Sequence, residues 1–230
     1  MRAESTVMNS LALFRGVEGL EETTFMQCLN VKKYGAGQQI IASSDASTDI
    51  FFVLQGAVIA QGYAQNGKEI TYSYLGQGEM FGEFAAVDGG DRSATIETVE
   101  ESTIARITSS DFRAIIAENP QLGLRLAEHL VAKSRELSQR MFEFGTLSVS
   151  GRVQAELLRL CEANAIVGNE CAIDPAPTHH EIANRIATHR EAVSREFSHL
   201  VSLGLIKAGR KTIQILNVAT LRKMVENIDV

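Results

Sequence analysis

Residues 80–94, MFGEFAAVDGGDRSA, carry the features from which the rest of this chain is interpreted. Gly82 lets a ligand approach the backbone closely, and the small residues after it predict a short helix whose first amides can bind an anion. Arg92 would neutralise the anion because a planar guanidinium matches phosphate oxygens, and the Ser93 hydroxyl would add a hydrogen bond. A carboxylate beside a phosphate needs a neutral donor, so the expected partner of Glu83 is a ribose hydroxyl. The stretch therefore predicts a pocket for a small anion that carries a sugar.

The same residues narrow the class of anion. The chain has no G-x-x-x-x-G-K-[ST] motif, and no group of carboxylates lies in this stretch to hold Mg²⁺. One arginine would leave most of the charge of a triphosphate unmatched, whereas it matches a singly charged phosphodiester well. A β-hairpin with a loose acidic loop is the alternative interpretation of Phe81-Gly82-Glu83, and the nearby Arg92-Ser93-Ala94 argues against it.

This stretch resembles the phosphate-binding cassette of cyclic-nucleotide-binding domains at Gly82, Glu83, Arg92, Ser93 and Ala94. The resemblance implies a 3′,5′-cyclic nucleotide bound inside a β-roll. It implies that Glu83 binds the ribose 2′-hydroxyl and that Arg92 and Ser93 bind the cyclic phosphate. The backbone amides around Glu83 and Phe84 complete the implied phosphate site.

Length and composition predict a globular, soluble chain of one or two domains. Its 230 residues are 45% hydrophobic, which is enough for an ordinary core in each domain. The longest apolar runs fall far short of the roughly 20 residues that span a bilayer, and residues 1–10 lack the apolar core of a signal peptide. We therefore expect a cytoplasmic protein with no membrane partner. Cys28, Cys161 and Cys171 are too few and too scattered for a disulfide framework or a metal centre, so we expect no metal.

The net charge of −6 is unevenly distributed. Residues 151–230 hold ten Lys and Arg against nine Asp and Glu, so residues 1–150 carry an excess of seven negative charges. Four of the five histidines also lie in the second part. This asymmetry predicts an acidic sensor domain followed by a near-neutral or mildly basic domain with a different partner.

Short apolar runs separated by glycines occupy residues 34–108 and predict a sandwich or barrel of β-strands. Asn66-Gly67 is a strong hairpin signal between two of these runs. The β-roll that the resemblance implies agrees with this pattern. The expected strands lie at 39–41, 50–54, 57–60, 70–75, 94–96 and 102–107.

Three helices are expected around the strands. Residues 11–29 are apolar at helical spacing with Glu21 and Glu22 at an expected N-terminal turn, which predicts a short helix packed on the first domain. Ser109-Ser110-Asp111 predicts a helix cap, and a long helix is expected from Pro120 to about Gly145. The long helix carries an approximate coiled-coil seam that one small β-domain cannot bury alone, so we expect it to pair with its copy in a homodimer. The alternative is a helix packed on its own domain. The seam consists of Ala127, Leu130, Ser134, Leu137, Met141 and Phe144.

Ser148-Val149-Ser150-Gly151 combines capping residues with a glycine and predicts an interruption after the long helix. We interpret it as a domain boundary and a hinge. The expected organisation is a sensor domain at 1–118, a dimerisation helix at 119–147 and a second domain at 148–230.

Residues 178–204 show a helix-turn-helix pattern. Thr178 and Glu181 have the spacing of a capping box, and a second helix is expected to begin after His189. An ordinary solvated helix face is the alternative for the start of that helix. A metal site at His179-His180 is disfavoured, because adjacent helical residues point about 100° apart.

The string R-E-x-V-x-R at 190–195 resembles the recognition helix of the bacterial cyclic AMP receptor protein family. The resemblance covers essentially the whole chain and implies an α+β fold: a jelly-roll-like β-roll that binds a cyclic nucleotide, a long dimerisation helix and a C-terminal winged helix-turn-helix domain. The implied wing is a hairpin at 206–216. Arg190, Glu191 and Arg195 would read a G-T-G-A half-site, since arginine can bind guanine and a carboxylate can accept from cytosine. The residues implied to lie near DNA phosphates are Thr178, His179 and His189.

The chain departs from the family pattern at two places. Glu196 stands where helix-turn-helix proteins usually bury an aliphatic residue, so either the helix is rotated or Glu196 reaches Arg185. The family's adjacent hydroxyl pair on the long helix, which meets the nucleobase across the dimer, is Leu137-Ser138 here. Ser138 alone keeps a hydroxyl for the base, and a hydroxyl can bind adenine or guanine. The resemblance therefore favours cAMP over cGMP, while the chemistry leaves both open.

The resulting hypothesis is a transcription regulator, not an enzyme, in which a cyclic nucleotide changes how a homodimer binds double-stranded DNA. RNA polymerase is a further expected partner. A gas or redox sensor of the same architecture is an alternative, but Cys28 alone does not supply the cysteine cluster or haem ligand that it needs. A second alternative is a cyclic-nucleotide-metabolising enzyme or a regulatory subunit, but either function would leave residues 190–195 without a role. The sequence does not distinguish an activator from a repressor.

Overall fold

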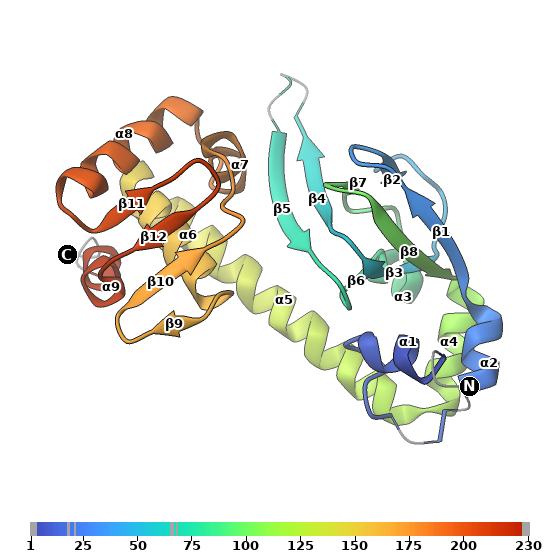
Figure 1. Ribbon diagram of the computed structural model, residues 1–230. Coiled ribbons are helices and arrows are strands. Elements are labelled where there is room, and N and C mark those ends of the chain that lie inside the picture. Colours follow the sequence, from blue (N-terminus) through green and yellow to red (C-terminus); the bar gives the residue numbers. More distant parts are fainter. Residues whose placement is uncertain (1–3, 18, 21, 65–66, 68, 227–230) are drawn as a thin grey trace. The chain divides into compact units, whose positions relative to one another are not determined.

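The computed structural model describes residues 4–17, 19, 20, 22–64, 67 and 69–226 (Figure 1). The chain divides into two compact units, Met1–Lys133 and Ser134–Val230, and the division falls inside the longest helix, α5 (Pro120–Thr146). The predicted fold class is confirmed, with a β-sheet domain, a long helix and a helix-turn-helix domain in that order. The finer division at 118 and 148 stays a prediction.

Two four-stranded antiparallel sheets form the centre of the first unit, with the strand orders β1-β8-β3-β6 and β2-β7-β4-β5. All six predicted strands are present, two with the predicted ends (β2 and β8) and four with shifted ends, and the strands β1 and β6 were not predicted. Asn66 of the hairpin signal lies outside the described residues. The strands are β1 (Asn30–Tyr34), β2 (Gln39–Ile41), β3 (Ile50–Gln55), β4 (Val58–Tyr63), β5 (Glu69–Leu75), β6 (Met80–Phe81), β7 (Thr95–Thr98) and β8 (Ser102–Ile107).

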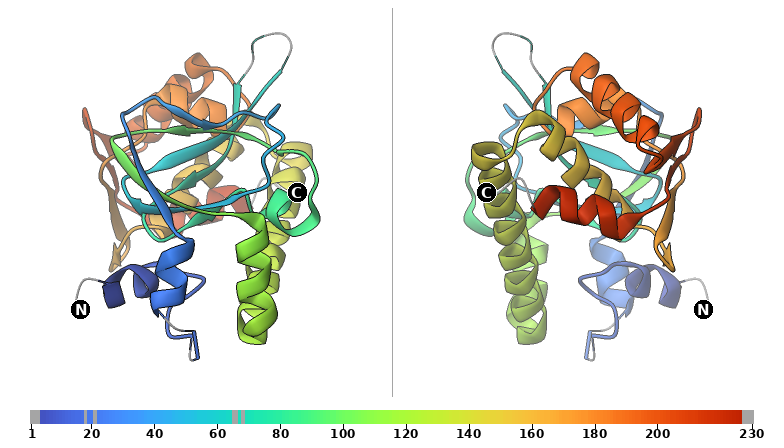
Figure 2. Two further views of the ribbon diagram at one scale, coloured as in Figure 1. Left: turned by 90° about the vertical axis from the view of Figure 1, so that its right-hand side faces the viewer. Right: turned by 90° about the vertical axis from the view of Figure 1, so that its left-hand side faces the viewer.

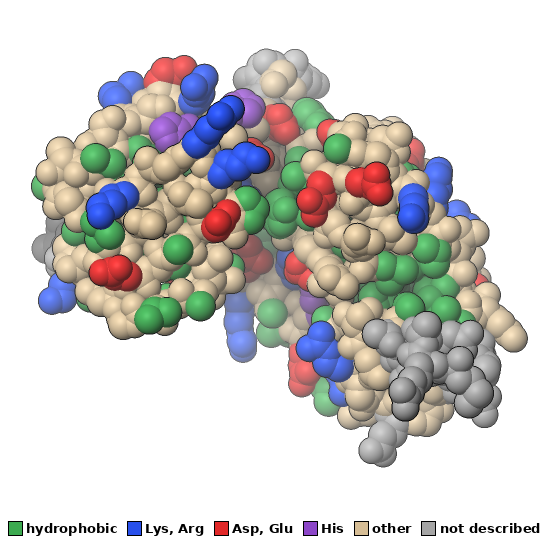
Figure 3. All heavy atoms as spheres, in the orientation of Figure 1, with side chains coloured by type: hydrophobic (Ala, Val, Ile, Leu, Met, Phe, Trp, Pro, Cys, Tyr) green, Lys and Arg blue, Asp and Glu red, His purple; other side chains and the backbone are tan. Residues whose placement is uncertain are grey.

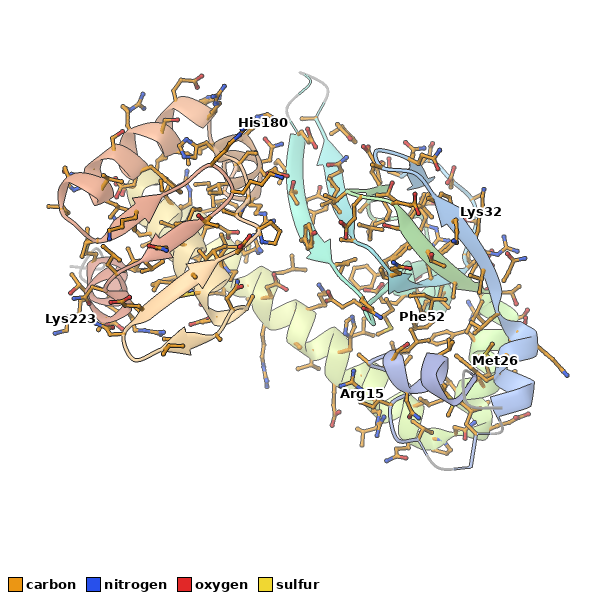
Figure 4. The ribbon with its side chains drawn as sticks, viewed as in Figure 1. Arg15, Met26, Lys32, Phe52, His180 and Lys223 are labelled. Carbon is orange, nitrogen blue, oxygen red and sulfur yellow. The ribbon has the colours of Figure 1, made fainter. Side chains whose placement is uncertain are left out.

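Strand β3 is buried on both faces and separates two hydrophobic clusters. Its residues alternate between the faces, as the period of two in a strand requires. Phe51 and Val53 pack between the two sheets, whereas Ile50 and Phe52 pack against the helices. Figure 4 labels Phe52, whose side chain is fully buried. An unbroken apolar run is therefore the expected sequence of this strand.

The helices of the first unit are α1 (Glu4–Ser10), α2 (Glu22–Cys28), α3 (Glu83–Asp88) and α4 (Ser109–Glu118). The short helix predicted within the run 11–29, with its N-terminal turn at Glu21-Glu22, corresponds to α2, although Glu21 lies outside the described residues; the first half of the run is not helical. Leu11 and Phe14 are fully buried, but they lie in turns. Gly16 and Gly19 have positive φ angles of 67° and 81°, which end regular helix. The N-cap of α4 is Thr108, one residue before the predicted cap, and its hydroxyl accepts from the Asp111 amide at 3.2 Å.

Helix α5 has 27 residues and is about 40 Å long. Leu130 of the predicted seam packs against the first unit's core and does not belong to an exposed stripe. Other large apolar side chains of α5 are exposed: Leu124, Val131, Leu137, Met141, Phe142 and Phe144. Within the described ranges, no helix is both long enough and apolar enough to cross a bilayer.

The second unit packs four helices on a four-stranded sheet of order β11-β12-β10-β9. Figure 2 shows α9 lying against α6, and contacts between these helices agree with the view. The interruption predicted after the long helix is present: α5 ends at Thr146 and Ser148 forms the N-cap of α6, while Gly151 lies buried inside α6. The elements are α6 (Val149–Glu162), β9 (Ile166–Val167), β10 (Glu170–Ile173), α7 (His179–Arg185), α8 (Arg190–Ser202), β11 (Ile206–Ala208), β12 (Ile213–Ile215) and α9 (Val218–Glu226).

A buried group of ion pairs, the Glu156 cluster, connects three helices of the second unit. It consists of Glu143 on α5, Glu156 and Arg159 on α6, and Arg185 on α7. Arg159 donates to both oxygens of Glu143, at 2.9 and 2.7 Å, and also to Glu156. Arg185 donates to the second oxygen of Glu156 at 3.2 Å. Burial alone would lower the pKa of Arg159, but Glu156 and Glu143 raise it above the ordinary value, so this guanidinium stays charged.

Candidate ligand pocket and nucleic-acid interface

The predicted phosphate-binding residues come together in the first unit around one concave site, the Arg92 pocket. Helix α3, strand β7 and the segment between them form its walls. Because Gly82 and Arg92 are brought face to face by this fold, the sequence motif becomes a single site. The lining residues are Ile41, Gly82, Glu83, Phe84, Ala85, Arg92, Ser93, Ala94 and Ile96.

Gly82 is required for two reasons. Its φ of 79° and ψ of 10° place it in the left-handed region, where it forms the N-cap of α3. A Cβ atom there would also lie 2.6 Å from Nη1 of Arg92 and 3.0 Å from the Asp49 carbonyl oxygen. Any other residue would be strained and would displace the Arg92 guanidinium.

Arg92 is held in the pocket by the backbone and by one hydroxyl. Its Nη1 donates to the Gly82 carbonyl at 3.1 Å, and its Nη2 donates to Ser47 Oγ at 3.0 Å and to the Asp49 carbonyl at 2.9 Å. The guanidinium also lies 5.7 Å from the centre of the Phe51 ring. These contacts fix the orientation of the group before any ligand is present.

The charge of Arg92 is incompletely compensated. The residue is only 6% exposed, and its Nε is buried without a hydrogen-bond partner among the residues that the structure describes. Burial lowers the pKa of Arg92, although the Asp49 carboxylate acts in the opposite direction. A bound anion would offset this loss of solvation, because the cost of burying a charge is recovered when an opposite charge is brought close.

The other cassette residues differ in exposure. Glu83 is 8% exposed, whereas Phe84 and Ser93 are exposed to solvent at the mouth of the pocket. Ser138, the residue expected to meet the nucleobase, belongs to the second unit and is exposed. Its hydroxyl donates to the Ser134 carbonyl at 2.9 Å within α5.

The sequence did not predict a role for Ser47 and Asp49, the residues that accept hydrogen bonds from Nη2 of Arg92. Ser47 and Asp49 precede β3 and lie more than forty positions from Arg92 in the chain, with separations of 45 and 43 residues. The acidic, hydroxyl-rich run Ser43-Ser44-Asp45-Ala46-Ser47 was a usable signal for a polar loop. His129 of α5, which lies beside Glu83, gave no sequence signal.

The helix-turn-helix of the second unit is built as predicted. The Thr178 hydroxyl accepts from the Glu181 amide at 3.2 Å, and the Glu181 carboxylate accepts from the Thr178 amide at 2.6 Å, which completes the capping box. The turn between α7 and α8 uses Ala187 with a positive φ of 53°. Ile182, Val193 and Phe197 bury the facing sides of the two helices.

The predicted base-reading residues lie on the solvent side of α8. Arg190, Glu191 and Arg195 are all exposed, and His189, also exposed, is the N-cap of the helix. In Figure 3, lysine, arginine and histidine side chains gather over the region of α7 and α8. These exposed side chains offer hydrogen-bond donors and one carboxylate acceptor, the groups that can bind base edges in a DNA groove.

His179 has a packing role in this structure. Its Nδ1 lies 2.8 Å from Ser194 Oγ, and its ring centre lies 4.4 Å from that of Phe197. Burial lowers the pKa of His179, and the charge of Arg190 lowers it further. A histidine whose ordinary value is 6.5 is then neutral at pH 7, so it supports α8 more than it offers charge to a phosphate.

The unusual residue Glu196 is buried, 8% exposed, and has a partner other than the expected one. Its Oε1 accepts from Gln154 Nε2 at 2.7 Å, while Arg185 pairs with Glu156. The sequence also predicted the wing, which is the hairpin of β11 and β12. Three exposed cations that were not predicted as contacts lie on this wing: Lys207, Arg210 and Lys211.

The described residues include no group of three or more His, Cys, Asp and Glu side chains placed to hold a metal ion. Cys161 and Cys171 are buried in the core of the second unit. Burial raises the pKa of Cys161 to about 12, with a further contribution from its contact with Cys171. This thiol is therefore unreactive at neutral pH.

Comparisons with known proteins match one family to each unit. A family described as "Cyclic nucleotide-binding domain" matches residues 31–119, and one described as "Crp-like helix-turn-helix domain" matches residues 151–224. The "cAMP-activated global transcriptional regulator CRP" of Haemophilus influenzae is 29% identical over 83% of this chain and 86% of the relative. The "Cyclic AMP receptor protein" of Thermus thermophilus is 28% identical over 94% of this chain and 98% of the relative.

Among solved structures, a mutant of CooA from Carboxydothermus hydrogenoformans has a TM-score of 0.81 at 18% identity, over 95% of this chain and 99% of that one. At this identity the likeness concerns the fold alone. The two family matches lie on the two sites described above, one on the Arg92 pocket and one on the helix-turn-helix. The chain is therefore a transcription regulator with a cyclic-nucleotide-binding domain and a Crp-like helix-turn-helix domain, homologous to the regulators of the CRP/FNR family.

Proposed function

We propose that this protein is a cytoplasmic homodimer that binds a 3′,5′-cyclic nucleotide in the Arg92 pocket and thereby gains affinity for specific DNA sites. The observation that carries the proposal is the buried Arg92, oriented by three hydrogen bonds and with Nε unpartnered among the described residues, in the same pocket as Glu83 and Ser93. One cation with one carboxylate fits a singly charged cyclic phosphate that carries a ribose.

The proposed ligand contacts are divided between charge and hydrogen bonding. Arg92, Ser93 and the amides around Glu83 and Phe84 bind the cyclic phosphate, Gly82 permits its approach, and the Glu83 carboxylate accepts from the ribose 2′-hydroxyl. Ser138 of the partner protomer binds the nucleobase. The names of the two relatives support cAMP as the favoured effector, with cGMP as the alternative.

The dimer is proposed from α5. Six large apolar side chains lie exposed along this helix, and Met141 alone is 72% exposed. A soluble monomer rarely exposes so much apolar surface on one element, whereas a pair of such helices buries it. Two copies would present two α8 helices to DNA half-sites one helical turn apart. RNA polymerase is the proposed partner of the DNA-bound dimer.

The test is a pair of titrations. Isothermal titration calorimetry with cAMP and with cGMP measures binding, and DNA affinity for a selected site is then measured with and without each nucleotide. We expect both nucleotides to bind and cAMP to bind better, with a preference of only several-fold because one neutral hydrogen bond distinguishes the bases. Binding of neither nucleotide would refute the proposal. Binding without any change in DNA affinity would refute the coupling.

Glu191→Ala should relax base preference in the half-site more than it lowers affinity for random DNA. The carboxylate is exposed on α8 and is proposed to accept from a cytosine amino group, and losing such a contact costs about 1–3 kcal/mol at that base pair. Selection of binding sites from a random pool measures the effect. Lys211→Ala on the wing is the matched control, since a lost phosphate contact should weaken all sequences alike. An unchanged consensus for Glu191→Ala would contradict the assignment of α8.

A further inference from the structure

His129 of α5 lies beside Glu83 at the edge of the Arg92 pocket. Its Nε2 is 3.9 Å from Oε1 of Glu83, and the two side chains are 29% and 11% exposed. Both residues belong to the first unit, so their separation is a property of one compact body. Here the long helix reaches the carboxylate that is proposed to bind the ribose.

The two atoms lie close together but beyond hydrogen-bond distance. A hydrogen bond from nitrogen to oxygen normally spans about 2.7–3.2 Å, so a movement of about 1 Å would close it. The Nε2 atom of His129 is buried and has no hydrogen-bond partner among the residues that the structure describes. Most buried polar atoms in folded proteins have a hydrogen-bond partner, so this unpartnered nitrogen needs an explanation.

The surroundings leave room for such a movement. The other side of His129 borders a cavity of about 500 Å³, which is also lined by Arg15, Arg125 and Glu128. Glu83 stands at the start of α3, and this helix is fixed by the buried Ala85 and Ala86. The approach is therefore expected from side-chain rotation of His129 and Glu83 and not from movement of the helix.

We propose that His129 is a positioning residue that orients Glu83 toward the ribose 2′-hydroxyl and so connects nucleotide occupancy to α5. This inference rests on the proposed function. A carboxylate has several acceptor sites, so Glu83 can accept from the ribose hydroxyl and from His129 Nε2–H together. Each of these two donors holds the Glu83 carboxylate in the orientation that the other donor needs. By thermodynamic linkage, ribose binding therefore strengthens the contact between His129 and Glu83 by the same factor as that contact strengthens ribose binding.

The experiment compares cAMP with 2′-deoxy-cAMP, which lacks the hydroxyl, by calorimetry on full-length variants. In the wild type the deoxy analogue should bind about 10- to 100-fold more weakly, as expected for one hydrogen bond to a charged acceptor. His129→Leu should reduce this ratio at least threefold and should reduce the nucleotide-dependent gain in DNA affinity. His129→Gln keeps a donor near the position of Nε2 and should restore most of both.

Two controls separate this role from general damage. Glu128→Gln changes the neighbouring residue, which is exposed and points about 100° away, and should leave the ratio unchanged. Thermal unfolding shows whether His129→Leu is destabilised. If it is, the test becomes the affinity ratio of cAMP to 2′-deoxy-cAMP in His129→Gln compared with that in Glu128→Gln, and both should be close to the wild-type ratio. A ratio unchanged within twofold in His129→Leu would overturn the inference while leaving cyclic nucleotide binding intact. A wild type that binds neither nucleotide would instead overturn the proposed function.

Discussion

Arg92→Ala should lower the affinity for cyclic nucleotide by at least about 100-fold. The variant loses the cation of the Arg92 pocket, and each hydrogen bond from a guanidinium to a charged group contributes about 1.5–3 kcal/mol. It also releases the Gly82 and Asp49 carbonyls and the Ser47 hydroxyl that Arg92 now binds, so the pocket becomes less ordered. Calorimetric titration with cAMP measures the loss.

Arg106→Ala is the matched control for Arg92→Ala. Arg106 pairs with the Asp49 carboxylate at 3.3 Å, but its side chain is 48% exposed and does not line the pocket. We expect its removal to change nucleotide affinity less than threefold, since exposed ion pairs contribute little. If Arg92→Ala bound cAMP as well as Arg106→Ala does, the pocket would be assigned wrongly.

Glu156→Ala should destabilise the second unit by about 3–5 kcal/mol, the usual effect of removing one partner from a buried ion pair. Glu156 is 1% exposed and accepts from both Arg159 and Arg185. Without it these two cations remain near each other, and Glu143 alone compensates Arg159. Hydrogen exchange of the α6 amides under increasing denaturant measures the stability of this unit separately from the first.

Glu162→Ala provides the comparison on the same helix. Glu162 pairs with Arg222 at 3.4 Å, with both side chains at least half exposed. We expect a loss of about 0–1 kcal/mol. Equal effects of the two alanine substitutions would show that burial of the Glu156 cluster does not determine its contribution.

Local sequence patterns were sufficient to predict the local structure wherever a single short stretch of chain determines it. The cassette at 80–94, the capping box at Thr178 and the strand pattern are of this kind, because turn glycines, cap spacings and apolar runs act within a few residues. The wing was predicted for the same reason. These are also the parts of the chain on which the proposed sites depend.

Other predictions failed where distant packing decides the outcome. The break after the long helix lies at its predicted place, but Gly151 is not part of it, because this glycine is buried within α6. Leu130 has the spacing of a seam residue, but its side chain packs against the hydrophobic core of the first unit. Residues 11–17 continue the helical spacing of the run but form turns, in which Leu11 and Phe14 are buried. His129 and Ser47 come close to the pocket residues Glu83 and Arg92 only through the tertiary fold, so no local pattern marks them.

The burial of the Glu156 cluster has a consequence for the response of the protein to ionic strength. Mobile ions screen exposed charges over about 8–10 Å at physiological salt, but they reach a carboxylate that is 1% exposed far less. The proposed contacts of Arg190, Arg195 and the wing lysines with DNA are exposed, so they compete with counterions and weaken steeply as salt rises. High salt should therefore release DNA while the helix-turn-helix stays folded, and dilution should restore binding without a refolding step.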